Sequence, residues 1–275
     1  TPPPLPAVRT ISLIRPLVWL GLAWHDMRRA GWISFAHGLV LALGGAAIVA
    51  IAHNRFWLLA GALSGFLVIA PVLATSLYAL SRALERKEKA DLGVVLKTWL
   101  NWQGSHISKW CNDYWCMVQF GSLLALAATG WVLTSAALIT LLAPVTIATP
   151  MDFVRYIILP PDNWLFELWL ALGGAMAAPI FASSVVAMPL LLDRRVTLMQ
   201  AVLTSWQTVL LNPIPMALWA ALIMGFTVMG LASLMLGLIP IIPMLGHASW
   251  HAYRDLVDAS TLPEREALSA PYVRP

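Results

Sequence analysis

Residues 32–52 read WISFAHGLVLALGGAAIVAIA, a stretch without any Asp, Glu, Lys or Arg. An α-helix rises 1.5 Å per residue, so about 20 apolar residues cross the roughly 30 Å of hydrocarbon in a bilayer. This stretch therefore predicts a membrane-spanning helix. The whole chain agrees, because 60% of its 275 residues are hydrophobic and 11% are charged, whereas soluble domains carry roughly 25% charged residues.

The same criterion predicts further spans along the chain. The polar turn His53-Asn54-Arg55 separates the first span from a second over residues 56–80. A third is expected over 118–142 and a fourth over 164–192. The apolar stretch 213–253 is too long for one span and contains Pro240 and Pro243, so we divide it near residues 231–238. We expect an all-α membrane protein with about six transmembrane helices.

Basic residues lie on one side of the expected spans. They gather before the first span, between the second and third, and after the fourth and the sixth, whereas the opposite loops hold Arg55 and Arg155. Cytoplasmic loops carry an excess of Lys and Arg, so both termini are expected in the cytoplasm of a bacterial inner membrane. The residues of the basic side are Arg9, Arg15, Arg28, Arg29, Arg82, Arg86, Lys87, Lys89, Lys97, Lys109, Arg194, Arg195 and Arg254.

Three segments of the chain align without gaps. They read Ala70-PVLATSLYALSRAL, Ala178-PIFASSVVAMPLLL and Ile242-PMLGHASWHAYRDL. Each has a proline, at Pro71, Pro179 and Pro243, within an expected span, where it is a candidate hinge. Upstream of each lies an amphipathic stretch with a tryptophan, Trp24, Trp99 or Trp206, which we interpret as an interfacial anchor.

These segments indicate three repeated hairpins, each preceded by a cytoplasmic interfacial amphipathic helix. The repeats cover approximately residues 14–83, 91–193 and 195–257 of a single polytopic membrane domain, residues 1–275. Residues 1–13 and 259–275 are expected to be flexible cytoplasmic tails. Gly61-x-x-x-Gly65 is a motif that allows two membrane helices to approach closely, so both glycines are candidate packing residues.

Two histidines have the spacing of metal or haem ligands. His247 and His251 are four residues apart, so a helix places them on one face. This pattern leaves open a haem or copper site, or an interfacial cluster in which each ring has a hydrogen-bond partner. His37 within the first span, and the neighbouring pair His25-Asp26, are further candidate polar contacts.

Other chemistry has little support in the sequence. Cys111 and Cys116, near His106, match no strong zinc signature, and Glu167 fits the outer headgroup region. No phosphate-binding loop, nucleophile elbow or zinc-protease motif is present, so we do not expect an enzyme or a required cofactor. Nucleic acid is not an expected partner either, because the basic residues flank apolar runs as membrane anchors do.

Four stretches resemble a bacterial family of predicted integral membrane proteins that is catalogued as a domain of unknown function (DUF2189-like). They read Trp19-LGLAWHDMRRA, Ala70-PVLATSLYALSRALER, Phe181-ASSVVAMPLLLDRR and Gly246-HASWHAYRDL. The resemblance extends from about Ile14 to Asp258. It implies a multi-span inner-membrane protein and brings no established activity or catalytic residue.

Three functions remain open from the sequence. The first is a non-catalytic accessory or assembly subunit that docks onto a larger membrane complex, respiratory or photosynthetic, in contact with membrane lipids. The second is a small-solute or lipid transporter or channel with a polar cavity. The third is a haem- or copper-binding protein that uses His247 and His251. The cavity of the second would be lined by Thr75, Ser76, Ser183, Ser184 and His247.

Overall fold

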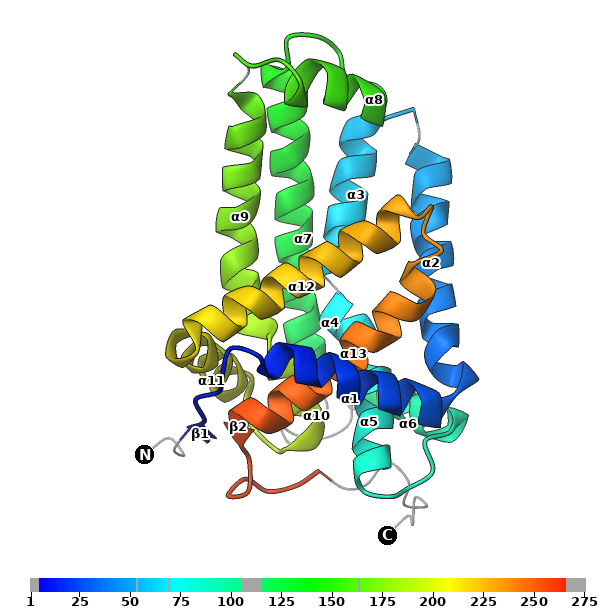
Figure 1. Cartoon of the computed structure of the whole chain (residues 1–275), viewed down its shortest axis with the longest axis vertical. Coiled ribbons are helices and arrows are strands. Elements are labelled where there is room, and N and C mark those ends of the chain that lie inside the picture. The colour runs from blue at the N-terminus through cyan, green and yellow to red at the C-terminus, as the bar shows by residue number, and fades with distance from the viewer. Residues whose placement is uncertain (1–4, 53, 69, 105–114, 163, 266–275) are drawn as a thin grey trace. The chain divides into compact units, whose positions relative to one another are not determined.

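A computed structural model describes residues 5–52, 54–68, 70–104, 115–162 and 164–265 as an all-helical chain with one pair of very short strands (Figure 1). Its elements are β1 Ala7–Val8, α1 Arg15–Ala30, α2 Trp32–Ala52, α3 Phe56–Val68, α4 Ala70–Leu73, α5 Thr75–Glu85, α6 Leu92–Gly104, α7 Trp115–Leu142, α8 Pro150–Phe153, the π-helix η2 Val154–Ile158, α9 Leu165–Ser184, α10 Ala187–Asp193, α11 Leu198–Leu211, α12 Pro213–Ala232, α13 Leu238–Leu256 and β2 Val257–Asp258.

Within the described residues, four helical stretches are long and apolar enough to cross a membrane. They are Trp32–Ala52, Cys116–Leu142, Leu165–Asp193 and Pro213–Ala232. They correspond to the first, third, fourth and fifth expected spans. The second and sixth expected spans, and with them the total of six, stay predictions.

The second expected span is interrupted rather than continuous. Its helix has a break at Ala74, between α4 and α5, three residues after the proline that follows Ala70. A proline inside a helix removes one backbone N–H and leaves a carbonyl to be satisfied by other groups. The hydroxyl of Thr75 donates to the carbonyl of Val72 at 2.6 Å, so the break keeps its polar groups paired.

The helix after Pro179 is interrupted in a similar way. α9 ends at Ser184, and α10 begins three residues later, at Ala187. The backbone N–H of Val186 donates to the hydroxyl of Ser205 on α11, at 3.3 Å, so a neighbouring helix supplies the missing acceptor. By contrast, α13 continues through Pro243.

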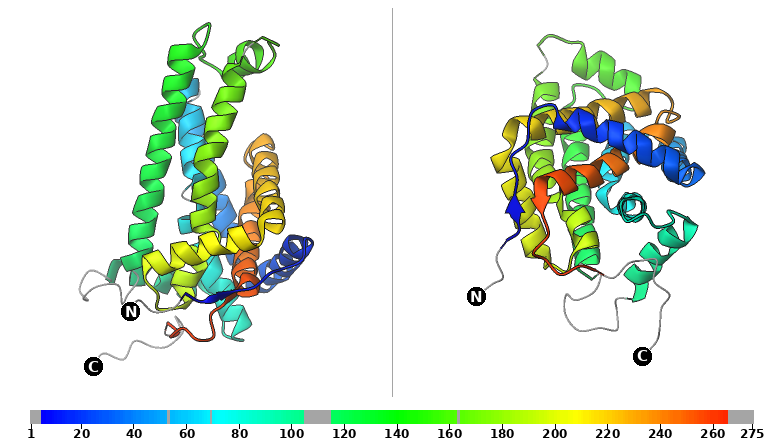
Figure 2. Two further views of the ribbon diagram at one scale, coloured as in Figure 1. Left: turned by 90° about the vertical axis from the view of Figure 1, so that its left-hand side faces the viewer. Right: turned by 60° about the horizontal axis from the view of Figure 1, so that its bottom comes forward.

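The chain forms two compact units. Unit 1 comprises Thr1–Ala42, Pro71–Phe120 and Ala182–Pro275, and unit 2 comprises Leu43–Ala70 and Gly121–Phe181. In unit 1, α12 and α13 form an antiparallel hairpin with its break at Ser233–Gly237, inside the expected boundary region. Helix α1 packs along α13, and β1 pairs with β2, so segments from the two ends of the described chain lie side by side (Figure 2).

The described part of the amino-terminal segment 1–13 makes specific contacts. Ala7 and Val8 pair with Asp258 and Val257 in an antiparallel ladder. The side-chain amide of Asn212 donates to the carbonyl of Arg9 and its oxygen accepts from the N–H of Ile11. These bonds hold residues 7–11 against β2 and against Asn212.

Unit 2 is held together by apolar packing among helices. Its buried cluster consists of Ile139, Ile147, Phe153, Ile157 and Leu165. The tryptophans Trp131 and Trp169 pack with ring centroids 5.6 Å apart, and the indole N–H of Trp169 donates to the hydroxyl of Ser135 at 2.9 Å.

The glycines of the Gly61-x-x-x-Gly65 motif face α7 inside unit 2. A Cβ built on Gly61 would lie 2.9 Å from Cγ1 of Val132, and one on Gly65 would lie 3.3 Å from Cγ2 of the same residue. Both distances are shorter than ordinary contacts, so the absence of a side chain lets α3 approach α7 closely.

We expect Gly61→Val to destabilise unit 2 by about 1–3 kcal/mol, because the added methyl groups would overlap Val132. Thermal unfolding of the protein in mild detergent measures the loss. The control is Gly130→Val on α7, since a Cβ there meets nothing within 4 Å. Equal melting temperatures for the two variants would contradict the close approach of α3 and α7.

Candidate functional site

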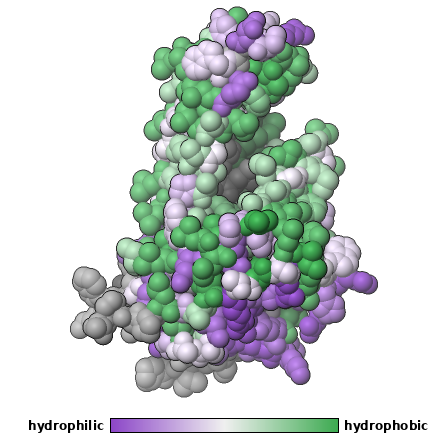
Figure 3. Space-filling model, turned by 60° about the vertical axis from the view of Figure 1, so that its left-hand side comes forward, coloured by the Kyte–Doolittle hydropathy of each residue, from purple (hydrophilic) through white to green (hydrophobic). Residues whose placement is uncertain are grey.

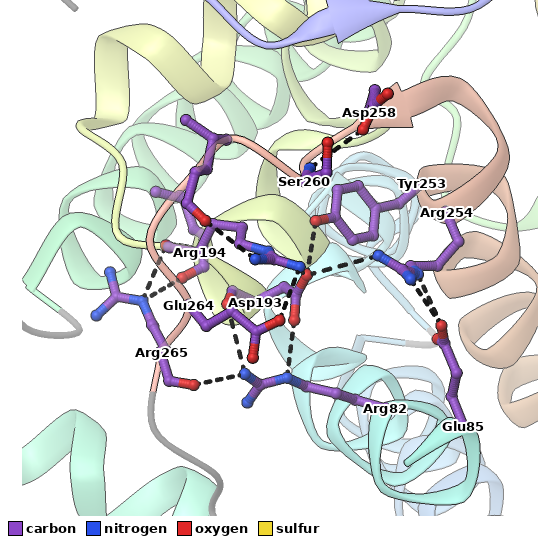
Figure 4. A network of polar contacts seen from close by, with 12 residues as sticks. Arg82, Glu85, Asp193, Arg194, Tyr253, Arg254, Asp258, Ser260, Glu264 and Arg265 are labelled. Atoms are coloured by element: carbon purple, nitrogen blue, oxygen red, sulfur yellow. Dashed lines mark hydrogen bonds and ion pairs between the residues drawn. The ribbon is translucent and has the colours of Figure 1, made fainter.

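Asp193, the last residue of α10, is the centre of a buried polar network in unit 1 (Figure 4). Its side chain is 3% exposed. Oδ1 accepts from Nε of Arg82 at 2.9 Å, and Oδ2 accepts from the hydroxyl of Tyr253 at 2.8 Å and from Nε of Arg194 at 3.0 Å. These partners belong to α5, to α13 and to the residue after α10. One carboxylate therefore joins the C-terminal parts of three helices.

The donors around Asp193 have further partners. Arg82 also donates to the carbonyl of Arg265 at 2.8 Å, and Nε of Arg265 donates to the carbonyl of Leu191 at 2.7 Å. Arg254 donates to Oε1 of Glu85 at 2.9 Å. The segment after β2 thus lies over the ends of α5 and α10 and closes the network.

Because this network is buried, breaking one of its ion pairs is expected to cost a large part of the free energy of unfolding. A charge moved out of water loses several kcal/mol of hydration, and it is tolerated only when opposite charges and hydrogen bonds replace the water. The side chain of Arg82 is 4% exposed and that of Asp193 is 3% exposed, so each depends on the other. Hydrophilic side chains gather at this end of unit 1, where α1, α5 and α13 meet (Figure 3).

Helix α1 is attached to the same end of unit 1 by a second acid. Arg15 donates to both carboxylate oxygens of Asp255, at 2.7 and 2.6 Å, and the indole N–H of Trp19 donates to Oδ2 at 2.7 Å. Trp19 is completely buried and packs edge-on against Trp219 of α12, with ring centroids 5.5 Å apart. These contacts fix α1 against the hairpin of α12 and α13.

A separate chain of hydrogen bonds crosses the interior of unit 1 between α1, α2, α5 and α13. The two ring nitrogens of His247 contact serine hydroxyls, Nε2 with Ser34 at 2.9 Å and Nδ1 with Ser81 at 2.7 Å. The hydroxyl of Ser81 also donates to Oδ2 of Asp26 at 2.7 Å. That oxygen lies 2.9 Å from Nε2 of His251. We call Asp26, Ser81, His247 and Ser34 the α1–α2 polar chain.

The local sequence explains how these groups meet. A Cβ on Gly246 would lie 2.5 Å from Cδ1 of Leu77, so the glycine lets α5 lie against α13 beside His247.

Burial acts to raise the pKa of Asp26, but hydrogen bonds from His251 and Ser81 outweigh it and hold the pKa below its ordinary value of 3.8. Asp26 is therefore an ionised carboxylate at neutral pH.

His247 and His251, which the spacing predicts on one helix face, have different partners. His247 is fully buried between two serines, whereas His251 contacts Asp26 and its side chain is 20% exposed. His37 lies elsewhere on α2, with Nε2 2.6 Å from the hydroxyl of Ser76. Among the described residues, no group of three or more His, Cys, Asp or Glu side chains is arranged to hold a metal ion.

The three tryptophans predicted as interfacial anchors lie on different helices of unit 1. Trp24 is half exposed on α1, Trp99 is partly buried on α6, and the indole of Trp206 donates to Ser183 at 2.9 Å. Cys116 is buried on α7, while Cys111 and His106 lie outside the described residues.

We predicted that Arg82 lies on the basic, cytoplasmic side, and we did not predict that the side chains of Arg82 and Asp193 are buried. Composition alone gives no reason to bury either charge. The aligned segments did contain a signal, since Arg82, Asp193 and Arg254 all lie near the ends of those segments.

One known protein family resembles part of this chain. Residues 58–193 match a protein family described as "Predicted integral membrane protein (DUF2189)". The predicted resemblance is confirmed over these residues. The match includes α3 to α10, with both Arg82 and Asp193, and ends before α11. No curated protein and no solved structure matches the chain.

We expect Asp193→Asn to lower the free energy of unfolding by about 3–5 kcal/mol, because it leaves the buried guanidinium of Arg82 without a counter-charge. Unfolding in mild detergent, followed by circular dichroism, measures the change. As a control, Arg9→Ala removes the exposed ion pair with Asp258, and such pairs contribute roughly 0–1 kcal/mol. If Asp193→Asn lowered the free energy of unfolding no more than the control does, Asp193 would not be the centre of the network.

Proposed function

We propose that this integral membrane protein is a non-catalytic accessory or assembly subunit that docks onto a larger membrane complex, respiratory or photosynthetic. The observation that supports this proposal is a face of small residues on α9 that points out of the chain. Ala171, Gly174, Ala175 and Ala178 are all exposed and follow the spacing of one helix face.

Small residues have a specific use in membrane helices. They let two backbones approach closely, whereas contact with lipid tails needs no small side chain. On α9, a Cβ on Gly173 would lie 3.0 Å from the ring of Trp131, so that glycine packs within the chain. A Cβ on the next residue, Gly174, meets nothing within 4 Å. The two glycines thus serve different faces, and the outer face fits a helix of another protein.

A similar face occurs on α12 in unit 1. Ala217, Ala221 and Gly225 are exposed and four residues apart, and a Cβ on Gly225 meets nothing within 4 Å. Many ionisable side chains of unit 1, in contrast, bind each other, as Arg82 and Asp193 do. A scaffold with internally paired charges and outward small-residue faces suits docking better than catalysis.

The contacts of the polar residues favour neither alternative function. A haem or copper ligand needs a free ring nitrogen, and both nitrogens of His247 contact serine hydroxyls. The transporter hypothesis placed Ser76 on a cavity wall, but Ser76 is fully buried and contacts His37.

To test docking, we would replace Gly174 with Ile in the tagged full-length chain and solubilise native membranes in mild detergent. We expect the chain to melt as the unchanged protein does, because Gly174 has open space around it, and to lose its co-purifying membrane complex. Gly130→Ile on α7 also enters open space and serves as the control that keeps the complex. An unchanged set of co-purifying proteins in Gly174→Ile would contradict docking through α9.

We also propose that the chain has six spans in three repeated units with the basic side in the cytoplasm. Two observations support this arrangement. An amphipathic helix, α1, α6 or α11, precedes each long apolar helix α2, α7 or α12. The ends of α5, α10 and α13 meet at Asp193, as the equivalent ends of three parallel repeats would.

Reporter fusions test this orientation. An alkaline phosphatase fused after Asn54 or after Asp162 is expected to be active, because that enzyme folds outside the cytoplasm, and a fusion after Glu88 is expected to be inactive. Activity at Glu88, or its absence at Asn54 and Asp162, would reverse the proposed orientation.

A further inference from the structure

Two arginines from different parts of the chain bind one carboxylate beside Asp193. Nη2 of Arg86 lies 3.1 Å from Oε2 of Glu264, and Nη2 of Arg194 lies 3.1 Å from Oε1 of the same side chain. Arg86 is the residue after α5, and Arg194 is the residue after α10. We call Arg86 and Arg194 the arginine pair. Each oxygen of the carboxylate thus has its own guanidinium group, supplied by a different helix end.

The arginine pair is positioned by groups other than Glu264. Nε of Arg194 donates to Oδ2 of Asp193 at 3.0 Å, and its Nη1 donates to the carbonyl of Leu262 at 3.0 Å. Nη2 of Arg86 lies 3.6 Å from Oδ1 of Asp193, which attracts this guanidinium group to the same place. A site whose side chains are held in advance loses little conformational entropy when it binds a ligand.

Asp193 alone does not balance the positive charge around it. Among the described residues, Arg82, Arg86 and Arg194 each have a nitrogen within 3.6 Å of its carboxylate. Glu264 supplies a second negative charge to this group. Three guanidinium groups therefore meet two carboxylates, and one positive charge remains in excess even while Glu264 is bound.

The position of Arg194 along the chain indicates that the arginine pair lies at the level of the lipid headgroups. The stretch Leu165–Asp193, which is long and apolar enough to cross a membrane, ends immediately before Arg194. An exposed basic residue follows each member of the pair, Lys87 after Arg86 and Arg195 after Arg194. Clusters of basic residues next to the ends of membrane helices attract anionic headgroups.

The carboxylate of Glu264 occupies a place that suits a phosphate group. Guanidinium groups recognise carboxylates and phosphates in the same way, because both anions present two or more oxygens to the N–H donors. A phosphate monoester carries about 1.5–2 negative charges at neutral pH, so it balances the excess charge better than a carboxylate does. The side chain of Glu264 is 55% exposed, so it can turn into water and leave both arginines to another anion.

We propose that Arg86 and Arg194 form a binding site for the phosphate group of an anionic lipid, and that Glu264 competes with the lipid for this site. Both anions use the same two guanidinium groups, so one excludes the other. A lipid is favoured over free phosphate because its acyl chains keep the headgroup beside the ends of the membrane helices. The site is separate from the small-residue faces of α9 and α12 and does not depend on docking through them.

Isothermal titration calorimetry of the full chain in mild detergent tests the site. The probes are dihexanoyl phosphatidic acid, dihexanoyl phosphatidylcholine and inorganic phosphate, and the heat of titration into empty micelles is subtracted from each. We expect phosphatidic acid to bind most tightly, because the headgroup of phosphatidylcholine has no net charge and inorganic phosphate has no acyl chains. An affinity for inorganic phosphate or for phosphatidylcholine equal to that for phosphatidic acid would contradict an anionic-lipid site.

Glu264→Gln distinguishes a lipid site from an ion pair with a purely structural role. The variant lacks the competing carboxylate, so its affinity for phosphatidic acid should rise about two- to fivefold, as expected for the loss of a partly exposed ion pair. A chain that fails to fold cannot produce such a gain. The control is Asp258→Asn, which removes the same charge from an exposed pair with Arg9 and should leave the affinity unchanged.

Arg86→Gln tests the opposite change, the loss of one member of the arginine pair. Its affinity for phosphatidic acid should fall about tenfold, because one charge-assisted contact with the phosphate is lost. Arg9→Gln removes an exposed positive charge outside the pair and should have no such effect. The proposal is wrong if Glu264→Gln fails to raise the affinity, if Asp258→Asn raises it equally, or if Arg86→Gln leaves it unchanged.

Discussion

The need to pair one buried carboxylate organises unit 1. Asp193 ends α10 and binds Arg82 from α5, Tyr253 from α13 and its neighbour Arg194. Removal of any of these donors leaves charge in a place that water does not reach, which is far more costly than the loss of an exposed ion pair. The ends of the three helices must therefore meet in one geometry. The apolar contacts along the helices are not directional and would permit many packing geometries.

This constraint also positions the polar groups deeper in unit 1. Ser81 is the residue before Arg82, so the anchoring of Arg82 fixes the rotation of α5 about its axis. That rotation points Ser81 at His247 and Asp26. The ion pair and the α1–α2 polar chain are thus two consequences of one helix orientation, and a change at Asp193 is expected to disturb both.

The long helices were predictable because lipid imposes a simple length rule on them. The expected first span, residues 32–52, has the bounds of α2, and the expected third and fourth spans differ from the observed stretches by a few residues. The break between α4 and α5 was not predicted, because hydropathy averages over Thr75 and Ser76, whose hydroxyl groups find partners inside the protein.

The candidate site was predictable only in part. The spacing of His247 and His251 indicated a shared helix face, but their partners come from α1, α2 and α5, which are distant in sequence. Tertiary contacts of this kind leave no local pattern. Arg82 was mispredicted for a different reason. It lies in a run of basic residues, which is typical of an exposed loop, but its side chain is buried.

The pairing of β1 with β2 has a consequence for the order in which the protein is built. Ala7 is synthesised early but its partner, Asp258, is 251 positions later. A ribosome at a typical speed of 5–20 residues per second takes roughly 10–50 s to cover that distance. During this interval the amino-terminal strand and α1 have no α13 to rest on. The contacts of both segments are therefore completed only when α13 has been made, and a chain stalled before α13 would expose both segments to quality-control proteases.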